Sequence, residues 1–209
     1  PIASIITQVL VSKDDPAFKN PSKPIGPFYT EEEAKRIAKA RGVTVKEDAG
    51  RGWRKVVPSP MPLSIIESDL IKIAIGNGAI VVASGGGGIP VYYDEHGRLT
   101  GLEAVIDKDF AAEKLAETID ADVLLILTAV DSVKINFRQP NEQSIDQITV
   151  GDAFKLIAQG QFAAGSMLPK VEAGINFVAG ANKRTCIITT PEKASQAVEG
   201  KAGTRIIAG

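Results

Sequence analysis

The sequence predicts an α/β fold, a three-layer αβα sandwich with a mainly parallel central sheet and a small protruding subdomain. From residue 63 onward, short runs of β-branched residues alternate with amphipathic segments. This pattern is typical of a parallel or mixed sheet covered by helices on both faces. Residues 14–62 differ, because they hold seven of the twelve prolines and few long apolar runs. We therefore expect residues 1–13 to bring a strand into the core sheet, residues 14–62 to form the subdomain, and residues 63–209 to form the α/β core.

The first 62 residues contain two clear elements. The stretch "SIITQVLV" (4–11) predicts a strand. The stretch "TEEEAKRIAKARG" (30–42) predicts a helix. Thr30 and Glu33 have the spacing of a capping box, in which each side chain binds a backbone N–H of the other residue. We expect this helix to rest in the subdomain.

In the core, strands and helices are expected to alternate, with Asn77-Gly78 ending the first helix and Thr149 capping the third. Apolar periodicity predicts helices over 63–76, 109–120, 149–160 and 168–180, strands over 79–83, 121–128 and 184–190, an edge strand over 204–209, and a hairpin over 92–101. Ligands of such sheets bind beyond the carboxyl ends of the strands. Four consecutive glycines follow the first core strand at that place.

Charge and composition exclude several classes of protein. The net charge of −1 lacks the basic excess of a nucleic-acid binder. No apolar run reaches the roughly 18 residues that a membrane-spanning helix needs. The one cysteine, Cys186, lies in the apolar stretch "TCIITT" and cannot form an intramolecular disulfide. We therefore expect a buried thiol in a reducing compartment, the cytoplasm.

The glycine run Gly85–Gly88 needs a reason, because glycine loses more backbone entropy on folding than any other residue. A dinucleotide fingerprint requires G-x-G-x-x-G at the start of a helix, whereas Pro90 and a hairpin follow here. One alternative is a merely mobile loop. The other is a loop whose bare amides closely approach a phosphate.

Three lysines lie in loops or at helix starts that could receive an anion. Lys108 lies between two aspartates in "IDKDF", where the next helix begins, and Lys170 follows the first-turn proline in "GSMLPK", facing out of that helix end. A helix N-terminus already favours anions, and a lysine adds a full positive charge. Lys23 is held among prolines in "NPSKPIGPF". The alternatives are a solvated surface triplet for Lys108 and a stiff connector for Lys23.

The end of the strand in "ILTAVDSV" (126–133) has small residues and Asp131. Small side chains at this place could admit a flat base. The alternative is a plain strand-to-loop turn.

No pair of histidines or cysteines has metal-ligand spacing, so no protein metal site is expected. A G-x-S-x-G elbow and the P-loop motif are also absent from the sequence. Lysines, a glycine loop and no evident general base together predict phosphoryl transfer to a small carboxylate-like substrate, since that chemistry needs mainly positioning and charge neutralisation.

Six stretches, in the same order along the chain, resemble the carbamate kinases of the amino-acid kinase family. They are "NPSKPIGPF", "KEDAGRGWRKVVPSP", "SGGGGIPV", "EAVIDKDFAAEKLA", "ILTAVD" and "GSMLPK". The resemblance implies the amino-acid kinase fold with its N-terminal part missing. It also implies reversible phosphoryl transfer between ATP, with Mg²⁺, and carbamate. It further implies that the protein produces ATP during arginine or citrulline breakdown, and that it forms a homodimer.

Carried over by motif, the resemblance implies that Lys108 and Lys170 stabilise the phosphoryl group in flight and that Asp109 holds them in place. Lys23, on the subdomain, would close over the substrate, and Gly85–Gly88 would line the site near the transferred phosphate. The nucleotide pocket would be shaped by Thr128, Ala129, Val130, Asp131, Ser166 and Met167.

The sequence departs from the family at its start. Family members begin with a strand and a "GGNA"-like loop and later carry an "HGNGPQ"-like loop, and this chain has neither. We therefore expect the parent protein to be an active kinase and these 209 residues to be inactive by themselves. The alternatives are another kinase of the amino-acid kinase family, a carbamate-kinase-like carbamoyl phosphate synthetase, or a non-catalytic fragment for nucleotide binding or dimerisation.

Overall fold

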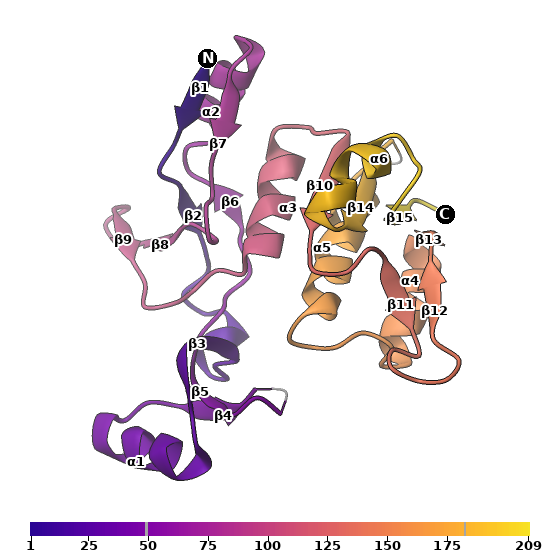
Figure 1. Ribbon diagram of the computed structural model, residues 1–209. Helices are drawn as coiled ribbons and strands as arrows, with labels where there is room; N and C mark the ends of the chain where they lie inside the picture. Colours follow the sequence, from indigo (N-terminus) through magenta and orange to yellow (C-terminus); the bar gives the residue numbers. More distant parts are fainter. Residues whose placement is uncertain (49, 182) are drawn as a thin grey trace. The chain divides into compact units, whose positions relative to one another are not determined.

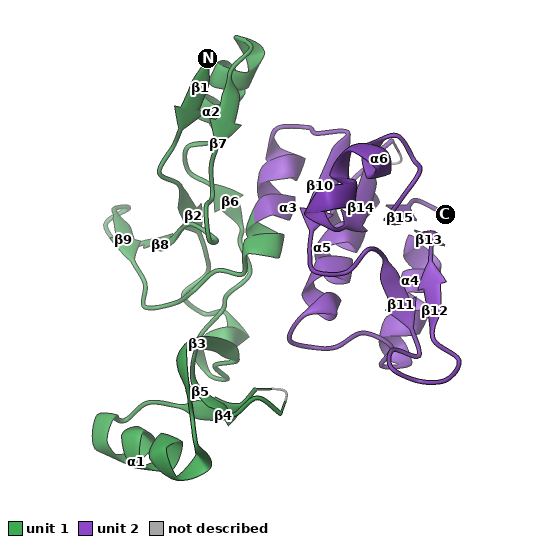
Figure 2. Cartoon of the chain, in the orientation of Figure 1, with its two compact units in different colours: residues 1–111 green, residues 112–209 purple. Residues whose placement is uncertain are grey.

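The computed structural model describes residues 1–48, 50–181 and 183–209 (Figure 1). The chain divides into two compact units, Pro1–Ala111 and Ala112–Gly209 (Figure 2). Their boundary falls inside one helix, α3 (Lys108–Thr118). The α/β class is confirmed in both units, whereas the domain limits expected at residues 13 and 62 stay predictions.

The strands described in unit 1 form three small sheets. The order is β1-β7 in a parallel pair, β6-β2-β8-β9 in a mixed sheet and β3-β5-β4 in an antiparallel sheet. The strands are β1 (Ile2–Ser4), β2 (Gln8–Leu10), β3 (Lys23–Tyr29), β4 (Val45–Glu47), β5 (Trp53–Val57), β6 (Ser64–Ile65), β7 (Ile80–Val82), β8 (Ile89–Tyr93) and β9 (Leu99–Gly101). The helices are η1 (Pro16–Phe18), α1 (Glu31–Arg41) and α2 (Ser68–Gly76).

Several local expectations for unit 1 are confirmed. Thr30 caps α1, and its side chain and that of Glu33 form the reciprocal bonds of the capping box. Strands β8 and β9 form the expected hairpin, with Tyr93 opposite Leu99. The sheet β3-β5-β4 and α1 lie within residues 14–62.

The continuous strand expected over 4–11 is wrong. Ile5 still donates its N–H to the carbonyl of Val82, but the carbonyl of Thr7 accepts the N–H of Ile89, where β8 begins. The Thr7 hydroxyl accepts the N–H of Ser84 at 2.8 Å and donates to the carbonyl of Ile5 at 3.0 Å. The chain thus leaves β7 and pairs with β8 instead, as strand β2.

Two further expectations for unit 1 are corrected. The helix expected from residue 63 begins at Ser68, because β6 precedes it and pairs with β2. Strand β7, expected to be buried, has side chains that are 67% exposed at Ile80 and 54% exposed at Val82. The cause is that β7 pairs with the short β1 and packs on α2.

The main sheet of unit 2 has the order β10-β14-β15-β13. β14 is parallel to β10 and antiparallel to β15, and β15 is parallel to β13. These strands are β10 (Val123–Leu127), β13 (Gln147–Thr149), β14 (Thr185–Thr189) and β15 (Thr204–Ile207); a separate hairpin joins β11 (Val133–Ile135) and β12 (Gln143–Ile145). The expectation that residues 204–209 form an edge strand is wrong, because the unpredicted β13 pairs with β15 on its outer side.

Helices α4 (Val150–Ala158) and α5 (Met167–Ala179) are confirmed, and η2 (Pro191–Lys193) and α6 (Ala194–Val198) complete unit 2. Gly174 lets α5 approach the sheet, since a Cβ there would lie 2.6 Å from Cδ1 of Ile206 and 2.9 Å from Sγ of Cys186. Cys186 is fully buried, as expected. Among the residues with described positions, no helix combines the length and apolarity required to span a membrane.

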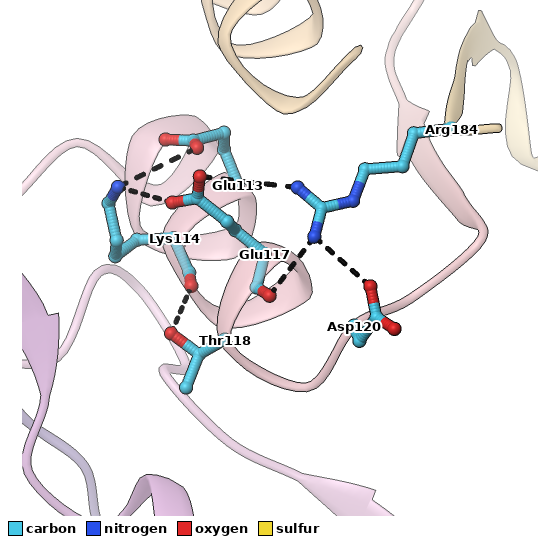
Figure 3. Close-up of polar contacts among 6 residues, drawn as sticks. All are labelled: Glu113, Lys114, Glu117, Thr118, Asp120 and Arg184. Carbon is cyan, nitrogen blue, oxygen red and sulfur yellow. Dashed lines mark hydrogen bonds and ion pairs between the residues drawn. The ribbon is translucent and has the colours of Figure 1, made fainter. Parts of the chain in front are cut away.

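A polar cluster binds the second half of α3 to the segment before β14 (Figure 3). The guanidinium of Arg184 lies 3.2 Å from a carboxylate oxygen of Asp120 and 4.0 Å from one of Glu117. Its Cζ also lies 5.1 Å from the centre of the Phe177 ring on α5. Arg184 therefore connects α3, α5 and the central sheet of unit 2.

Candidate functional site

The four glycines form the loop between β7 and β8, and the structural reason for glycine differs from one position to the next. A Cβ at Gly87 would lie 2.3 Å from the carbonyl oxygen of Ile106, and one at Gly88 would lie 2.5 Å from Cγ2 of Val9. Both residues also have φ in the left-handed region, at 136° and 84°. Gly87 and Gly88 are thus required by backbone packing.

Gly85 and Gly86 face open space instead. A Cβ at either position would meet no atom within 4 Å, and the φ of Gly86 is not positive. Both residues line a depression of about 260 Å³ between the ends of β1 and β7. Of the four, Gly86 is therefore the glycine for which the surrounding protein gives neither a steric nor a conformational reason.

Ser84 is a residue of this loop that sequence reasoning missed. It is buried with φ at 59°, and its hydroxyl oxygen has no hydrogen-bond partner among the residues of known placement. The depression is lined by Ser84 and by Thr7, whose hydroxyl binds the Ser84 N–H. A left-handed backbone at a non-glycine residue and a buried hydroxyl without a partner both cost free energy. Such features often occur at functional sites.

The segment before α3 brings together several charged residues in unit 1. One oxygen of Asp107 accepts the N–H of Asp109 at 2.9 Å, which caps the helix, and the other accepts a hydrogen bond from the ammonium of Lys23. Lys108 lies 3.9 Å from the carboxylate of Asp109. Burial by itself would raise the pKa of Asp107. The hydrogen bonds from Lys23 and Asp109, with the positive charges of Lys23 and Lys108, hold it below its usual value.

The glycine loop adjoins this charged segment. Gly87 contacts the carbonyl of Ile106, the residue directly before Asp107. Two motifs that lie some twenty residues apart in the sequence are thus neighbours in unit 1. Asp107 was not predicted as a site residue, although its place before a helix, next to Lys108, is a signal for an N-cap.

Lys170 lies in unit 2, in the first turns of α5, and is 8% exposed. The sequence placed it facing out of the helix end, and the structure buries it. The reason is the helical period: Lys170 shares a face with Gly174 and Phe177, and Gly174 lies against the sheet. Because Lys108 and Lys170 belong to different units, their convergence on one group stays a prediction.

Unit 2 contains a cavity of about 200 Å³ beyond the carboxyl end of β10. Five of the six residues predicted to shape a nucleotide pocket line it, together with six others. The full lining is Thr128, Ala129, Val130, Ser132, Lys134, Phe137, Gln161, Phe162, Ala163, Ser166 and Met167. Its wall is mostly apolar, with a few polar groups, which is the usual character of a small-molecule site.

The sixth predicted residue, Asp131, lies outside this lining. Its carboxylate accepts hydrogen bonds from Lys193 at 2.7 Å and from Thr190 at 3.3 Å. The bond from Lys193 is the main cause that lowers the pKa of Asp131. Its role at the nucleotide stays a prediction. Sequence reasoning missed Lys134, Phe137 and Gln161, because they come from a hairpin and a loop that carry no recognised motif.

The described residues were compared with the donor sets that proteins use to hold a metal ion. Within residues 1–48, 50–181 and 183–209, no group of three or more His, Cys, Asp or Glu side chains is placed to hold one. This arrangement is compatible with Mg²⁺, which often binds through one or two carboxylates and the phosphates of a nucleotide.

Comparison with known proteins adds to this geometry. A model of the amino acid kinase family matches residues 5–189. The chain is 55% identical to a carbamate kinase of Clostridium perfringens over 206 residues, and 51% identical to one of Thermococcus kodakarensis over 207 residues. Each alignment covers 99% of this chain and 65% of the relative. The chain thus spans about 65% of the length of the curated relatives it matches.

Solved structures give the same result. A carbamate kinase from Giardia lamblia bound to citric acid has a TM-score of 0.92 and 45% identity, covering 100% of this chain and 65% of that one. The same enzyme bound to AMP-PNP has a TM-score of 0.86 and 46% identity, covering 100% of this chain and 66% of that one. The expected amino-acid kinase fold is therefore confirmed, and the chain belongs to the amino acid kinase family.

Proposed function

We propose that the whole protein is a carbamate kinase, which transfers a phosphoryl group reversibly between ATP and carbamate. The cavity of unit 2 carries this proposal, because five predicted nucleotide-pocket residues line it. Its mostly apolar wall suits a flat base. The similar Giardia lamblia enzyme bound to AMP-PNP supports the same assignment.

Phosphoryl transfer does not require the protein to form a covalent bond with the substrate. Phosphoryl transfer needs alignment of donor and acceptor and positive charge around the moving group. In our proposal, Lys108 and Lys170 supply that charge, Asp109 orients Lys108, and Gly85 and Gly86 leave room for phosphate oxygens. Lys23 assists in substrate capture. When bound, Mg²⁺ would neutralise the nucleotide phosphates.

We further propose that the protein works in the cytoplasm as a homodimer and makes ATP from carbamoyl phosphate. In this proposal the 209-residue chain binds a nucleotide but lacks turnover. The cavity is built from unit 2 alone, whereas the chain spans about 65% of the length of its relatives.

The test measures ATP formation from ADP and carbamoyl phosphate, with the whole protein and with this chain, and ADP binding to the chain by calorimetry. We expect turnover by the whole protein and ADP binding without turnover by the chain. A whole protein that is inactive with carbamoyl phosphate but active with another acyl phosphate would reassign the substrate. Turnover by the chain would refute its proposed inactivity.

A further inference from the structure

Next to the cavity of unit 2, one carboxylate connects two parts of the cavity wall. We propose that Glu142 is a positioning residue for the nucleotide, which holds the loop of Phe137 in place and neutralises Lys134. Lys134 then serves as a wall of the cavity and not as a ligand of the phosphates. This inference rests on the proposed function, because it requires a nucleotide in the cavity.

Both oxygens of Glu142 are engaged. Oε1 lies 2.6 Å from the ammonium nitrogen of Lys134, and Oε2 accepts the backbone N–H of Arg138 at 2.8 Å. The bond from Lys134 first, and then that from Arg138, hold the pKa of Glu142 below its usual value. Glu142 is therefore a carboxylate at neutral pH, and its negative charge offsets that of Lys134 beside the cavity.

The loop between β11 and β12, residues 136–142, has a backbone that needs such support. Asn136 and Arg138 have φ at 52° and 62°, the left-handed region that side chains disfavour. This conformation persists where surrounding contacts impose it. One contact is the Arg138–Glu142 bond, and another is the bond from the Asn136 N–H to Oε1 of Gln161, at 2.8 Å.

Phe137 lies between these two anchored residues. Phe137 lines the cavity and is 48% exposed, and the Arg138 guanidinium carbon lies 5.3 Å from the centre of its ring. An aromatic ring at the cavity wall can stack on a flat base. A loop ordered before binding loses less entropy when the ligand arrives. Loss of the Glu142 anchor should therefore weaken binding of the base and spare the contacts of the phosphates.

Two roles of Lys134 can be distinguished by ligand binding. If its charge were offered to the phosphates, replacement of Lys134 would weaken ADP much more than adenosine. If Glu142 neutralises it, the two ligands should be weakened alike. Lys134→Met keeps the apolar stem along the cavity and removes the charge. Glu142→Ala removes both of the bonds that Glu142 makes.

The experiment titrates ADP and adenosine into this 209-residue chain and its variants by calorimetry. We expect Glu142→Ala to weaken adenosine about tenfold and ADP by as much or less, because it leaves the charge of Lys134 unpaired. Lys134→Met should weaken both ligands by about threefold or less. The control is Glu199→Ala, which removes a surface ion pair of similar length, 2.7 Å to Lys201. It should leave both affinities unchanged.

Each outcome has a separate meaning. An adenosine affinity within twofold of wild type for Glu142→Ala, or a loss for Lys134→Met that is tenfold larger with ADP than with adenosine, would overturn the inference alone. An unmodified chain that binds neither ligand would remove the nucleotide site and so the proposed function. If Glu142→Ala does not fold, Phe137→Leu removes the ring and leaves the anchor intact. It should weaken both ligands equally, and unchanged binding would overturn the inference.

Discussion

The Lys23 ammonium group donates a hydrogen bond to the carboxylate of Asp107, 84 residues further along the chain. The other oxygen of the same carboxylate caps α3, the helix that begins with Lys108. Asp107 thus connects the start of strand β3 to the predicted catalytic lysine. The proposed closure of Lys23 over a substrate would begin from this ion pair.

Replacing Asp107 should separate its two roles. Asp107→Asn keeps a cap for Asp109 but removes the charge, so we expect a loss of about 1–2 kcal/mol in the free energy of unfolding. Asp107→Ala also removes the cap and should cost about 1 kcal/mol more. Lys23→Met combined with Asp107→Asn should be less damaging than the sum of the single changes. Thermal denaturation of the wild type, the three single variants and the double variant measures these effects, and strict additivity would contradict a direct coupling.

The same ion pair predicts that the free energy of unfolding decreases at acidic pH. The pKa of Asp107 is lower in the folded chain than its ordinary value. Its contribution is therefore fully present above the ordinary aspartate pKa, near 4, and is lost as the pH falls below it. Asp107→Asn should reduce this decrease in a series of thermal melts.

The glycine loop permits a matched pair of substitutions. Gly87→Ala places a Cβ 2.3 Å from the Ile106 carbonyl at a φ of 136°, so we expect a loss of about 3 kcal/mol or more. Gly86→Ala meets open space at an ordinary φ and should leave stability within about 1 kcal/mol of wild type.

Activity then tests the proposed purpose of the loop. If phosphate oxygens approach Gly86, the new methyl group should lower turnover of the whole protein at least about tenfold, although the fold is intact. Full activity of Gly86→Ala would show that phosphate does not pass there.

Local rules predicted most elements of the fold. The capping box of α1, the Thr149 cap of α4 and the apolar run of β10 depend on residues close in sequence, and all three are confirmed. The failures involve long-range pairing. β13 is three residues long and is defined by its contact with β15. The break between β1 and β2 depends on Thr7 meeting Ser84, which no local pattern reveals.

The site was predictable where a motif carries it. The five cavity residues at 128–130, 166 and 167 belong to two recognised stretches. Phe137, Lys134 and Glu142 were missed, because a hairpin with left-handed residues and side-chain anchors has no sequence signature. The burial of Lys170 was missed, because a place at a helix start does not by itself determine which face of the helix packs on the sheet.

The two predicted catalytic lysines call for different substitutions. Lys108 is largely exposed, so Lys108→Ala should leave the fold intact, whereas Lys170 is buried and is better replaced by Met. If each neutralises charge in the transition state, either change should lower kcat of the whole protein about 10²-fold or more. Lys23→Ala should mainly raise KM. The exposed Lys201→Ala is the control, and a loss under about threefold for Lys170→Met would remove Lys170 from the catalytic set.

Glu113, in the cluster that joins α3 to Arg184, is 2% exposed (Figure 3). Burial raises its pKa to about 7, although the charges of Lys114 and Arg184 oppose the shift. The folded chain therefore holds a proton that the unfolded chain has lost between the ordinary glutamate value and 7. Stability should fall as the pH rises through that window, by up to about 3 kcal/mol.

Glu113→Gln should remove this dependence, because the amide has nearly the same shape and no charge. We expect the variant to be more stable than wild type at pH 8, and its melting temperature to vary less between pH 4.5 and 7. The matched control is Glu33→Gln on α1. The Thr30 backbone N–H lowers the pKa of Glu33, so that carboxyl titrates below the window. An unchanged slope in Glu113→Gln would mean that the Glu113 carboxyl is already ionised at pH 5, with Lys114 and Arg184 outweighing its burial.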